Sequence, residues 1–272
     1  MLTLVPTPIG NIADISLRSI EAFANADVIL CEDTRVTKKL IMLLGERYGL
    51  HVKEPRFISV HSHNEKDFIL KLEPSFFNQN VIYVSDAGMP GISDPAQELV
   101  RYCIENFIEY DVLPGANAVL SAFVASGFVT TKMLFYGFLP HKGGERSSAL
   151  QEALFNGYTT VLYESPHRLI KLLDALHVNV PNRKIFLAKE ISKRYQTFYR
   201  GVAQELIEKL QRGVKGEWVV VIEAGEIYRS SISEADILAF ELPKKVSSKL
   251  IAKITGENPK ACYNRLINNE IK

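Results

Sequence analysis

The chain has 272 residues, 47% of them hydrophobic and 23% charged, which is the composition of a folded globular protein with room for two cores of ordinary size. The N-terminus has no basic segment followed by an apolar run, and no stretch is long and apolar enough to cross a bilayer, so we expect a cytoplasmic protein with no membrane partner. The three cysteines are widely spaced and form no CxxC pair, which indicates neither a disulfide framework nor a zinc site.

The net charge of +1 conceals an uneven distribution of charge along the chain. Acidic residues prevail in residues 1–131, whereas basic residues prevail in 132–200 and again from 240 to the end. A basic second half favours a polyanionic partner such as nucleic acid. Solvated helix faces produce the same pattern, so the charge distribution alone does not decide between the two.

The chain begins with a short apolar strand over residues 2–5. This strand ends in a loop that is stiffened by two prolines and released by Gly10. Ser16 is placed to cap a helix that runs to about Asn25.

A second strand, over residues 27–30, runs directly into a dense polar cluster. The cluster contains Glu32, Asp33 and Arg35. One interpretation is an ion-paired helix start with Thr34 as its N-cap; the other is a cluster that faces a substrate.

The third strand, residues 57–60, is followed by two histidines. His61 and His63 face the same way on an extended segment, which raises the possibility of a metal site, but no third ligand stands at a useful spacing. Ser62 and Glu65 match a capping box that would open the next helix.

Residues 81–84 are β-branched or aromatic and predict a buried strand that leads into a glycine-containing loop. Gly88 and Gly91 permit backbone angles that other residues avoid. Asp94 is placed as the N-cap of the next helix, with a proline at the first helical position and Gln97 completing a capping-box-like pair. Small ligands bind at such strand ends in open α/β sheets, although a tight connection without a ligand fits the same stretch.

The first half continues with a short strand that breaks at Pro114-Gly115 and a small, apolar helix within 116–127. The alternation of strands and helices predicts a mostly parallel sheet. The second half has a basic loop at 140–146, which lacks the GK[ST] order of a nucleotide-binding loop. Its later strands are more closely spaced, which favours antiparallel pairing and a mixed sheet.

The tail contains two short helices, 242–256 and 258–267, the second with Asn258 as N-cap and a proline after it. Lysines between the apolar positions suit a helix-turn-helix-like contact with nucleic acid, and a packing extension of the core is equally allowed. We therefore expect three parts, which are an N-terminal α/β domain (1–114), a C-terminal α/β domain (115–225) and a basic helical extension (226–272).

Six motifs in this order resemble the ribosomal RNA small subunit methyltransferase I family, part of the tetrapyrrole-methylase-like superfamily of S-adenosylmethionine-dependent methyltransferases. They are Leu4–Asn11, Cys31–Arg35, Ser62–Glu65, Val84–Pro95, Gly137–Pro140 and Tyr163–Arg168. The resemblance spans essentially the whole chain. It implies two α/β domains with the methyl donor in the cleft between them, a homodimer, and 2′-O-methylation of a cytidine in the decoding region of 16S rRNA in the small ribosomal subunit.

Two positions depart from the family pattern. The usual Pro-Gly-Pro-Ser-Ala is replaced by Pro114-Gly-Ala-Asn-Ala118, which puts an amide in place of a serine hydroxyl, and Gln196 stands where the family often has glutamate. Individual contacts at these positions are therefore in question.

Given this resemblance, the chemistry of methyl transfer points to a set of candidate site residues. Because methyl transfer is an in-line displacement, positioning and desolvation are the main tasks, and the donor S-adenosyl-L-methionine needs mostly backbone contacts. We expect these from Pro8, Gly10, Ser85, Asp86, Ala87, Gly88, Gly91, Ile92, Ser93, Pro114, Gly115, Ala116, Ala118, Tyr163 and Ala188. A ribose hydroxyl is a poor nucleophile and profits from a general base or a polarising cation; the candidates are Glu32, Asp33, Arg35, His63, Asn64 and Glu65. Phosphates would be bound by Lys142, Arg146, Arg168, Lys244 and Lys245. No metal is expected.

Three rival functions remain to be separated from this one. A porphyrinoid C-methyltransferase would use the same cleft without needing a basic tail. An RNA-binding module that has lost the donor is disfavoured by the intact glycine loop. A nicotinamide oxidoreductase is disfavoured because no GxGxxG follows the first strand.

Overall fold

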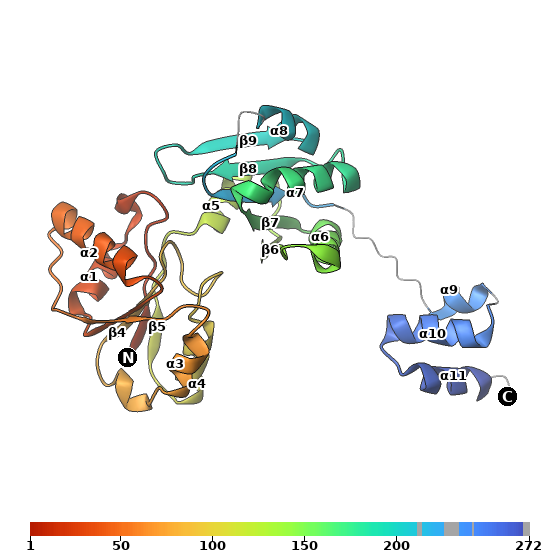
Figure 1. Ribbon diagram of the computed structural model, residues 1–272, viewed down its shortest axis with the longest axis horizontal. Helices are drawn as coiled ribbons and strands as arrows, with labels where there is room; N and C mark the ends of the chain where they lie inside the picture. The colour runs from red at the N-terminus through yellow and green to blue at the C-terminus, as the bar shows by residue number, and fades with distance from the viewer. Residues whose placement is uncertain (211–213, 226–233, 241, 269–272) are drawn as a thin grey trace. The chain divides into compact units, whose positions relative to one another are not determined.

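The computed structural model describes residues 1–210, 214–225, 234–240 and 242–268. The chain divides into a compact unit from Met1 to Glu226 and a small helical unit from Ile227 to Lys272 (Figure 1). The first unit contains two sheets, and the three-part division at residues 114 and 225 stays a prediction. Residues 226–233, with which the expected extension begins, lie outside the described part of the chain.

The first sheet is parallel throughout and has the strand order β3-β2-β4-β1-β5. The parallel arrangement predicted from the strand–helix alternation is therefore confirmed. Its strands are β1 (Leu2–Leu4), β2 (Val28–Cys31), β3 (Arg56–Ser59), β4 (Val81–Val84) and β5 (Tyr110–Val112).

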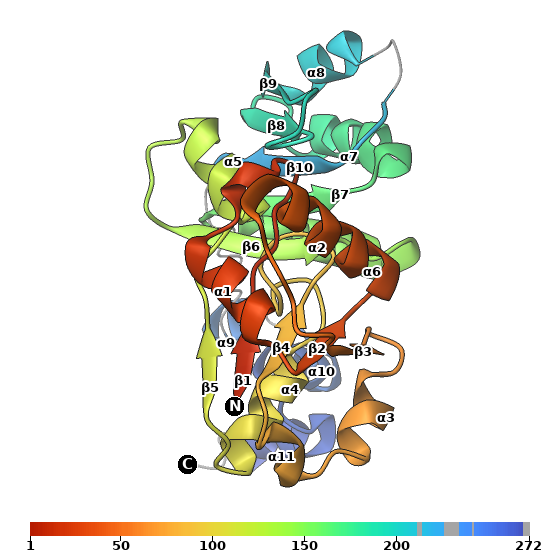
Figure 2. The same ribbon diagram turned by 90° about the vertical axis from the view of Figure 1, so that its left-hand side faces the viewer.

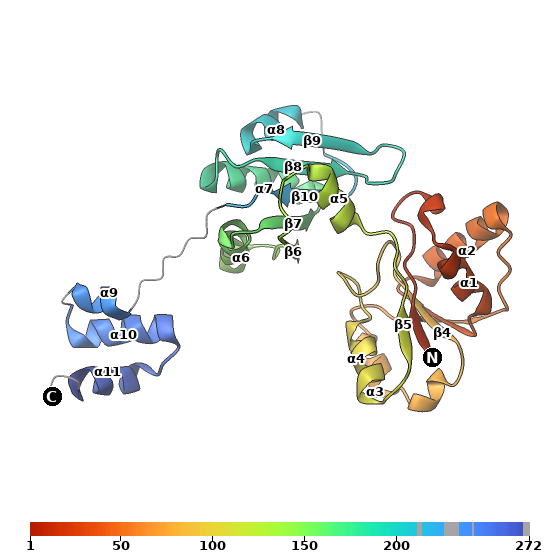
Figure 3. The same cartoon turned by 180° about the vertical axis from the view of Figure 1, so that it is seen from behind.

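Helices cover both faces of this sheet because its inner strands β2 and β4 are apolar and buried on both sides. Along β4, Val81 and Tyr83 point to one face, and Ile82 and Val84 point to the other. The first face packs against α3 and α4, and the second packs against α1 and α2 (Figures 1 and 3). The helices are α1 (Leu17–Asn25), α2 (Thr34–Tyr48), α3 (Glu65–Leu70) and α4 (Gln97–Glu105), with 3₁₀ turns at Ile12–Asp14 and Pro74–Phe77.

The second sheet is mixed, as predicted, with the order β6-β7-β10-β8-β9. Strands β6 and β7 are parallel, whereas β10 runs antiparallel to both of its neighbours. One face packs against α5, and the other packs against α6, α7 and α8 (Figure 2). The elements are α5 (Ala118–Ser126), β6 (Met133–Phe138), α6 (Gly143–Phe155), β7 (Thr159–Glu164), α7 (Pro166–Asn179), β8 (Ile185–Lys189), β9 (Thr197–Gly201), α8 (Ala203–Lys209) and β10 (Trp218–Ile222).

The C-terminal unit is helical and has its own small core. Its helices are α9 (Glu234–Ala239), α10 (Lys244–Thr255) and α11 (Pro259–Asn268). Ile237, Ile251 and Cys262 meet in this core, one residue from each helix. The predicted Asn258 cap is confirmed, since its side chain accepts a hydrogen bond from Lys260 N at 2.9 Å. Gly256, with φ of 74°, closes α10 as predicted.

Three predicted helix starts are wrong, namely the Thr34 cap of α2, the Asp94 start of α4 and the Ser62–Glu65 capping box of α3. Helix α2 is capped by Asp33, whose carboxylate accepts a hydrogen bond from Arg35 N, and not by Thr34. Helix α4 begins at Gln97 instead of after Asp94, and its N-cap Ala96 has φ of 117°.

One contact, between the Glu65 side chain and the backbone of Ala96, explains the errors at α3 and α4. The Glu65 carboxylate accepts a hydrogen bond from Ala96 N at 2.9 Å, so it holds the start of α4 and forms no capping box with Ser62. Gln97 donates its side-chain amide to Gly91 O at 2.7 Å and thereby closes the preceding loop.

Candidate functional site

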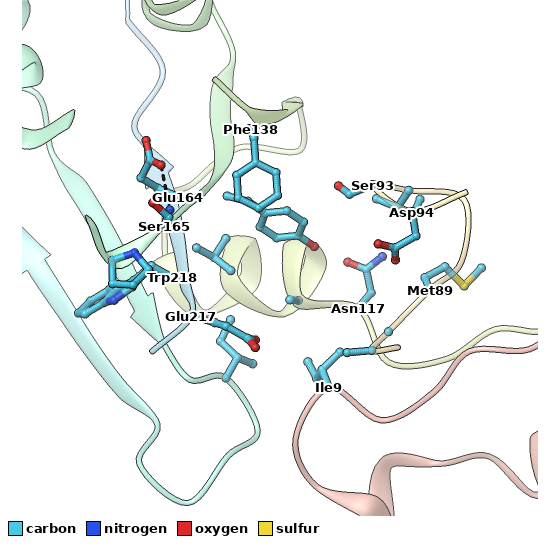
Figure 4. Close-up of a pocket in the computed structure, with 18 residues that line it drawn as sticks. Ile9, Met89, Ser93, Asp94, Asn117, Phe138, Glu164, Ser165, Glu217 and Trp218 are labelled. Atoms are coloured by element: carbon cyan, nitrogen blue, oxygen red, sulfur yellow. Dashed lines mark hydrogen bonds between the residues drawn. The ribbon is translucent and has the colours of Figure 1, made fainter. Parts of the chain in front are cut away.

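A cavity of about 390 Å³ lies where the carboxyl ends of β1 and β4 face the second sheet (Figure 4). Ile9 and the loop from Ala87 to Asp94 form one wall. Phe138, Tyr163 and Trp218 belong to the opposite wall, and Asn117 and Ala118 bring the start of α5 between them. A ligand site at this sheet edge is where an open parallel sheet places one.

The glycine loop after β4 is shaped by two buried hydroxyls. The Thr7 hydroxyl donates to Ser85 O at 3.2 Å, and the Ser85 hydroxyl donates to Gly88 O at 3.1 Å. Thr7 and Gly88 also exchange backbone hydrogen bonds of 3.0 and 3.1 Å. Gly88 has φ of 89°, which a side chain would strain, and a Cβ there would lie 3.1 Å from Ile9. Ser85 therefore shapes the wall of the cavity from behind and does not line it.

The segment before α5 crosses the first loop of the chain at very short range. A Cβ on Gly115 would lie 2.4 Å from the Pro6 Cβ, so only glycine fits there. Two residues later, Asn117 caps α5 by accepting a hydrogen bond from Leu120 N at 3.0 Å. The amide thus performs the capping task that serine performs equally well, which accounts for that departure from the family pattern.

Only some of the residues expected to hold the donor line the cavity. The lining ones are Ala87, Gly88, Ile92, Ser93, Ala118 and Tyr163. Pro8, Gly10, Ser85, Asp86, Gly91, Pro114, Gly115, Ala116 and Ala188 do not line it. No binding role was predicted from the sequence for five residues that line the cavity, which are Asp94, Asn117, Phe138, Glu217 and Trp218. Asp94 and Phe138 stand inside two of the six family motifs, and Asn117 stands in the segment that departs from the family pattern. For Asp94, a helix cap was the competing interpretation.

Partly buried and exposed carboxyls gather beside this cavity. The Glu32 carboxylate accepts a hydrogen bond from Asp86 N at 3.1 Å, and Asp86 in turn accepts one from Asp33 N. Burial, with the nearby Asp94 as the next cause, raises the pKa of Glu32 to about 7. Burial and the charge of Asp86 raise the pKa of Asp94 to about 6. Both groups therefore exchange protons close to neutral pH, and Asp94 does so in the cavity wall.

The other catalytic candidates make structural contacts. Hydrogen bonds from Arg35 lower the pKa of Asp33 to about 2, which makes it a weak base. Asn64 accepts a hydrogen bond from His61 N and donates to Ser59 O, fixing the end of β3. The rings of His61 and His63 meet edge-to-face at 5.9 Å, and within the described ranges they belong to no metal-binding group of three or more His, Cys, Asp or Glu.

Two of the predicted phosphate contacts are occupied inside the protein. Glu164, whose side chain is 1% exposed, pairs with Arg146 at 2.9 Å and with Arg168 at 2.8 Å. The same guanidinium groups donate to Pro140 O and Leu139 O. They therefore hold the loop after β6 in place, and little of either remains for a phosphate. Lys142, at the exposed start of α6, stays available, as does Lys245 at the start of α10.

The cavity suits a ligand with both apolar and positively charged parts, as S-adenosylmethionine has. Its volume falls within the range of small-molecule sites, and Ile9, Met89 and Phe138 give it apolar walls. Glu217 brings a carboxylate to its edge (Figure 4), which suits a positively charged group of the ligand. The start of α5, where backbone N–H groups lack partners within the helix, suits a carboxylate.

The described part of the chain contains no helix that is long and apolar enough to span a membrane.

Comparison with known proteins places these features in a family. Residues 1–207 match the family of tetrapyrrole (corrin/porphyrin) methylases. The chain is 44% identical to "Ribosomal RNA small subunit methyltransferase I" of Campylobacter fetus, covering 98% of this chain and 100% of the relative. It is 40% identical to the protein of the same name from Helicobacter pylori, covering 97% and 96%.

Solved structures agree on the fold. The uroporphyrin-III C-methyl transferase of Thermus thermophilus, complexed with S-adenyl homocysteine, matches with a TM-score of 0.54 at 14% identity, covering 81% of this chain and 96% of that one. At that identity the likeness concerns the fold alone. On the strength of the sequence matches, the chain belongs to the tetrapyrrole methylase family and, within it, to the ribosomal RNA small subunit methyltransferase I group.

Proposed function

We propose that this protein transfers the methyl group of S-adenosylmethionine to the 2′-hydroxyl of a cytidine in the decoding region of 16S rRNA, with the small ribosomal subunit as its partner. The observation that carries the proposal is the cavity between the two sheets, with the Asp94 carboxyl in its wall, in a chain that is 44% identical to a named ribosomal RNA methyltransferase. The substrate implies a cytoplasmic location.

The bound donor supplies an electrophilic methyl group on a positively charged sulfur. The residues of the cavity then have three tasks, which are to exclude water, to orient the donor and to accept a proton. Ile9, Met89 and Phe138 exclude water from the reacting groups, and the Gly88 loop and the start of α5 orient the donor. The remaining task is to accept the proton of the ribose hydroxyl.

Asp94 is the carboxyl best placed for that proton, because it lines the cavity, whereas Glu32 lies behind it. At saturating RNA and donor we expect the transfer rate to rise with pH through an apparent pKa of about 6, since only ionised Asp94 accepts a proton. Asp94→Asn should remove this dependence and lower the rate by about 10²- to 10⁴-fold. Glu32→Gln is the matched control and should keep the low-pH limb. A limb near pH 7 that disappears in Glu32→Gln and persists in Asp94→Asn would assign the proton to Glu32 instead.

The proposed activity is tested with labelled S-adenosylmethionine and small subunits from cells that lack this protein. Transfer of label to the rRNA is the expected result. The rival within the superfamily is tested in parallel with uroporphyrinogen as acceptor. Label in the porphyrinoid and none in the RNA would overturn the proposal.

The C-terminal unit offers a further basic surface for the same partner. Lys245, Lys249, Lys253 and Lys260 are exposed on α10 and α11. Arg265 is not part of this surface, because it pairs with Glu234 at 2.6 Å and Glu257 at 2.9 Å and so stabilises the unit internally. The proposed role of Lys244 and Lys245 is to bind phosphates from this unit.

A homodimer, which the resemblance implies, would explain the exposed face of α5. This helix carries no charged residue, and its Leu120 and Val124 are 53% and 78% exposed, while Val119 and Ala122 pack on the second sheet. We propose that a second copy covers this face.

Sedimentation velocity tests this interface. The wild type should sediment as a dimer, and Val124→Asp should dissociate it at micromolar concentration. Val178→Asp is the matched control, since Val178 is 79% exposed on α7, and it should leave the dimer intact. A dimer that survives Val124→Asp would place the interface elsewhere.

A further inference from the structure

A second hollow, of about 730 Å³, adjoins the central cavity and has a different chemistry. It is lined by Gly10–Ile12 of the first loop, by Leu43, Glu46 and Arg47 at the end of α2, and by Ser192–Arg194 between β8 and β9. Figures 1 and 3 both show the β8–β9 connection extending toward the side of the first unit where α1 and α2 lie. We call this hollow the arginine groove.

The groove lies next to the central cavity along two chain segments, each of which contributes consecutive residues to the two hollows. Ile9 and Ile191 line the central cavity, and the residues that follow them, Gly10 and Ser192, line the groove. A ligand that enters the cavity and is longer than one nucleotide therefore has the groove beside it.

Two arginines of the groove have no partner that neutralises them. Among the described residues, neither Arg47 nor Arg194 has an ion-pair or hydrogen-bond partner, and both are exposed. Lys193 is different, because it pairs with Glu190 at 3.3 Å and Glu217 at 3.0 Å. Among the described residues that line the groove, only Glu46 is acidic, whereas Arg47, Lys193 and Arg194 are basic. The net charge of the lining is therefore positive.

Each of these arginines lies over a tyrosine. The Arg47 guanidinium is 5.5 Å from the Tyr48 ring, and that of Arg194 is 5.6 Å from the Tyr195 ring. The tyrosines are 42% and 69% exposed, which leaves ring area free. Arginines beside exposed aromatic rings suit an unpaired RNA strand, whose phosphates the arginines neutralise and whose bases stack on the rings.

The segment that presents Arg194 is held in one conformation. Glu190 and Ser192 have φ of 52° and 63°, which non-glycine residues rarely adopt. The Glu190 carboxylate accepts a hydrogen bond from Glu217 N at 2.8 Å, and Gln196 accepts one from Ser192 N at 2.7 Å. Ser192 also bonds to Asp14, which ties the segment to the first loop. The backbone that carries Arg194 is therefore fixed by these contacts without a ligand.

From this arrangement we propose that the arginine groove binds the unpaired RNA next to the nucleotide to be methylated, with Arg47 and Arg194 on its phosphates and Tyr48 and Tyr195 against its bases. The inference rests on the proposed rRNA substrate and names a binding surface for it on the first unit, distinct from the lysines of the C-terminal unit.

The test is equilibrium binding of the full-length protein to a fluorescent single-stranded RNA that carries the decoding-region sequence, measured by anisotropy at several salt concentrations. Arg47→Ala/Arg194→Ala should weaken binding at least tenfold and reduce the slope of log K against log[salt] by about 1 to 1.5, the value for two phosphate contacts on a single strand. Arg18→Ala/Arg101→Ala, which removes two exposed arginines elsewhere on the same unit, is the charge-matched control and should change neither quantity. Tyr48→Leu/Tyr195→Leu should weaken binding while leaving the salt slope unchanged, since stacking releases no counterions.

Equal binding and equal slope in the Arg47/Arg194 variant and its control would overturn the groove as an RNA site. If the wild type then still methylates rRNA, the proposed function stands without the groove. Conversely, RNA binding that depends on Arg47 and Arg194, in a protein that transfers no methyl group to RNA, would support the groove and remove the proposed function.

Discussion

Replacing Glu164 by alanine is expected to destabilise the second sheet by about 3–5 kcal/mol, because it leaves two guanidinium groups, each 18% exposed, without their shared counter-ion. Urea unfolding followed by tryptophan fluorescence reports this directly, since the chain has a single tryptophan, Trp218, on β10 of the same sheet. The midpoint should move to lower urea, with an unchanged dependence on denaturant concentration.

The control for this variant is Glu105→Ala, which breaks the surface pair with Arg101 at 2.9 Å and should cost no more than about 0.5 kcal/mol. Glu164→Gln should lie between the two, because the amide keeps one acceptor and loses the charge. If Glu164→Ala unfolded at the same urea concentration as Glu105→Ala, the two arginines would not depend on Glu164, and their availability for phosphates would have to be considered again.

Gly115→Ala is expected to weaken binding of S-adenosylhomocysteine at least tenfold and to cost about 1–3 kcal/mol of stability, the usual price of forcing an extra group into a packed contact. The new Cβ would lie 2.4 and 2.8 Å from the Pro6 ring, which cannot rotate away. The two crossing segments lead to Ile9 and Asn117 in the cavity wall, so separating them displaces both. Isothermal titration calorimetry and thermal unfolding measure the two effects.

Gly144→Ala is the matched control, since no atom lies within 4 Å of its new Cβ and it stands in the first turn of α6. Its donor affinity should equal that of the wild type, and its stability should be unchanged or raised by up to about 1 kcal/mol. Wild-type affinity in Gly115→Ala would mean that the Pro6–Gly115 crossing does not position the cavity wall.

The sequence predicts elements whose signals are local. Alternating strands and helices gave the parallel first sheet, Asn258 and Gly256 marked the C-terminal helices, and Ser16 caps α1 as expected. These signals work because hydrophobic periodicity and capping are decided within a few residues of the chain.

Contacts between remote segments are what the sequence does not predict. The Asp94-Pro95 pair matches a helix start, yet Glu65 holds Ala96 N and delays α4, while Asp94 turns to the cavity. Arg146 and Arg168 match a phosphate site, yet Glu164 binds both. In each case the partner is set by tertiary packing, which overrides a local propensity.

The arginine groove also depends on contacts between segments that are remote in the sequence. Arg47 lies in the last turn of α2, and Arg194 stands in the connection between β8 and β9 of the other sheet. Neither belongs to a motif, and only the folded chain brings them to one hollow. Residues that act together without a shared motif are therefore the part of a site for which the structure is needed.

The central claim is tested most directly by mapping 2′-O-methylation in 16S rRNA by nuclease digestion and mass spectrometry. Small subunits from cells lacking this protein are incubated with S-adenosylmethionine and the purified wild type, with Asp94→Asn as the inactive control. We predict one newly methylated cytidine in the decoding region with the wild type and none with the variant. An rRNA that gains no methyl group from a protein that binds the donor would contradict the account.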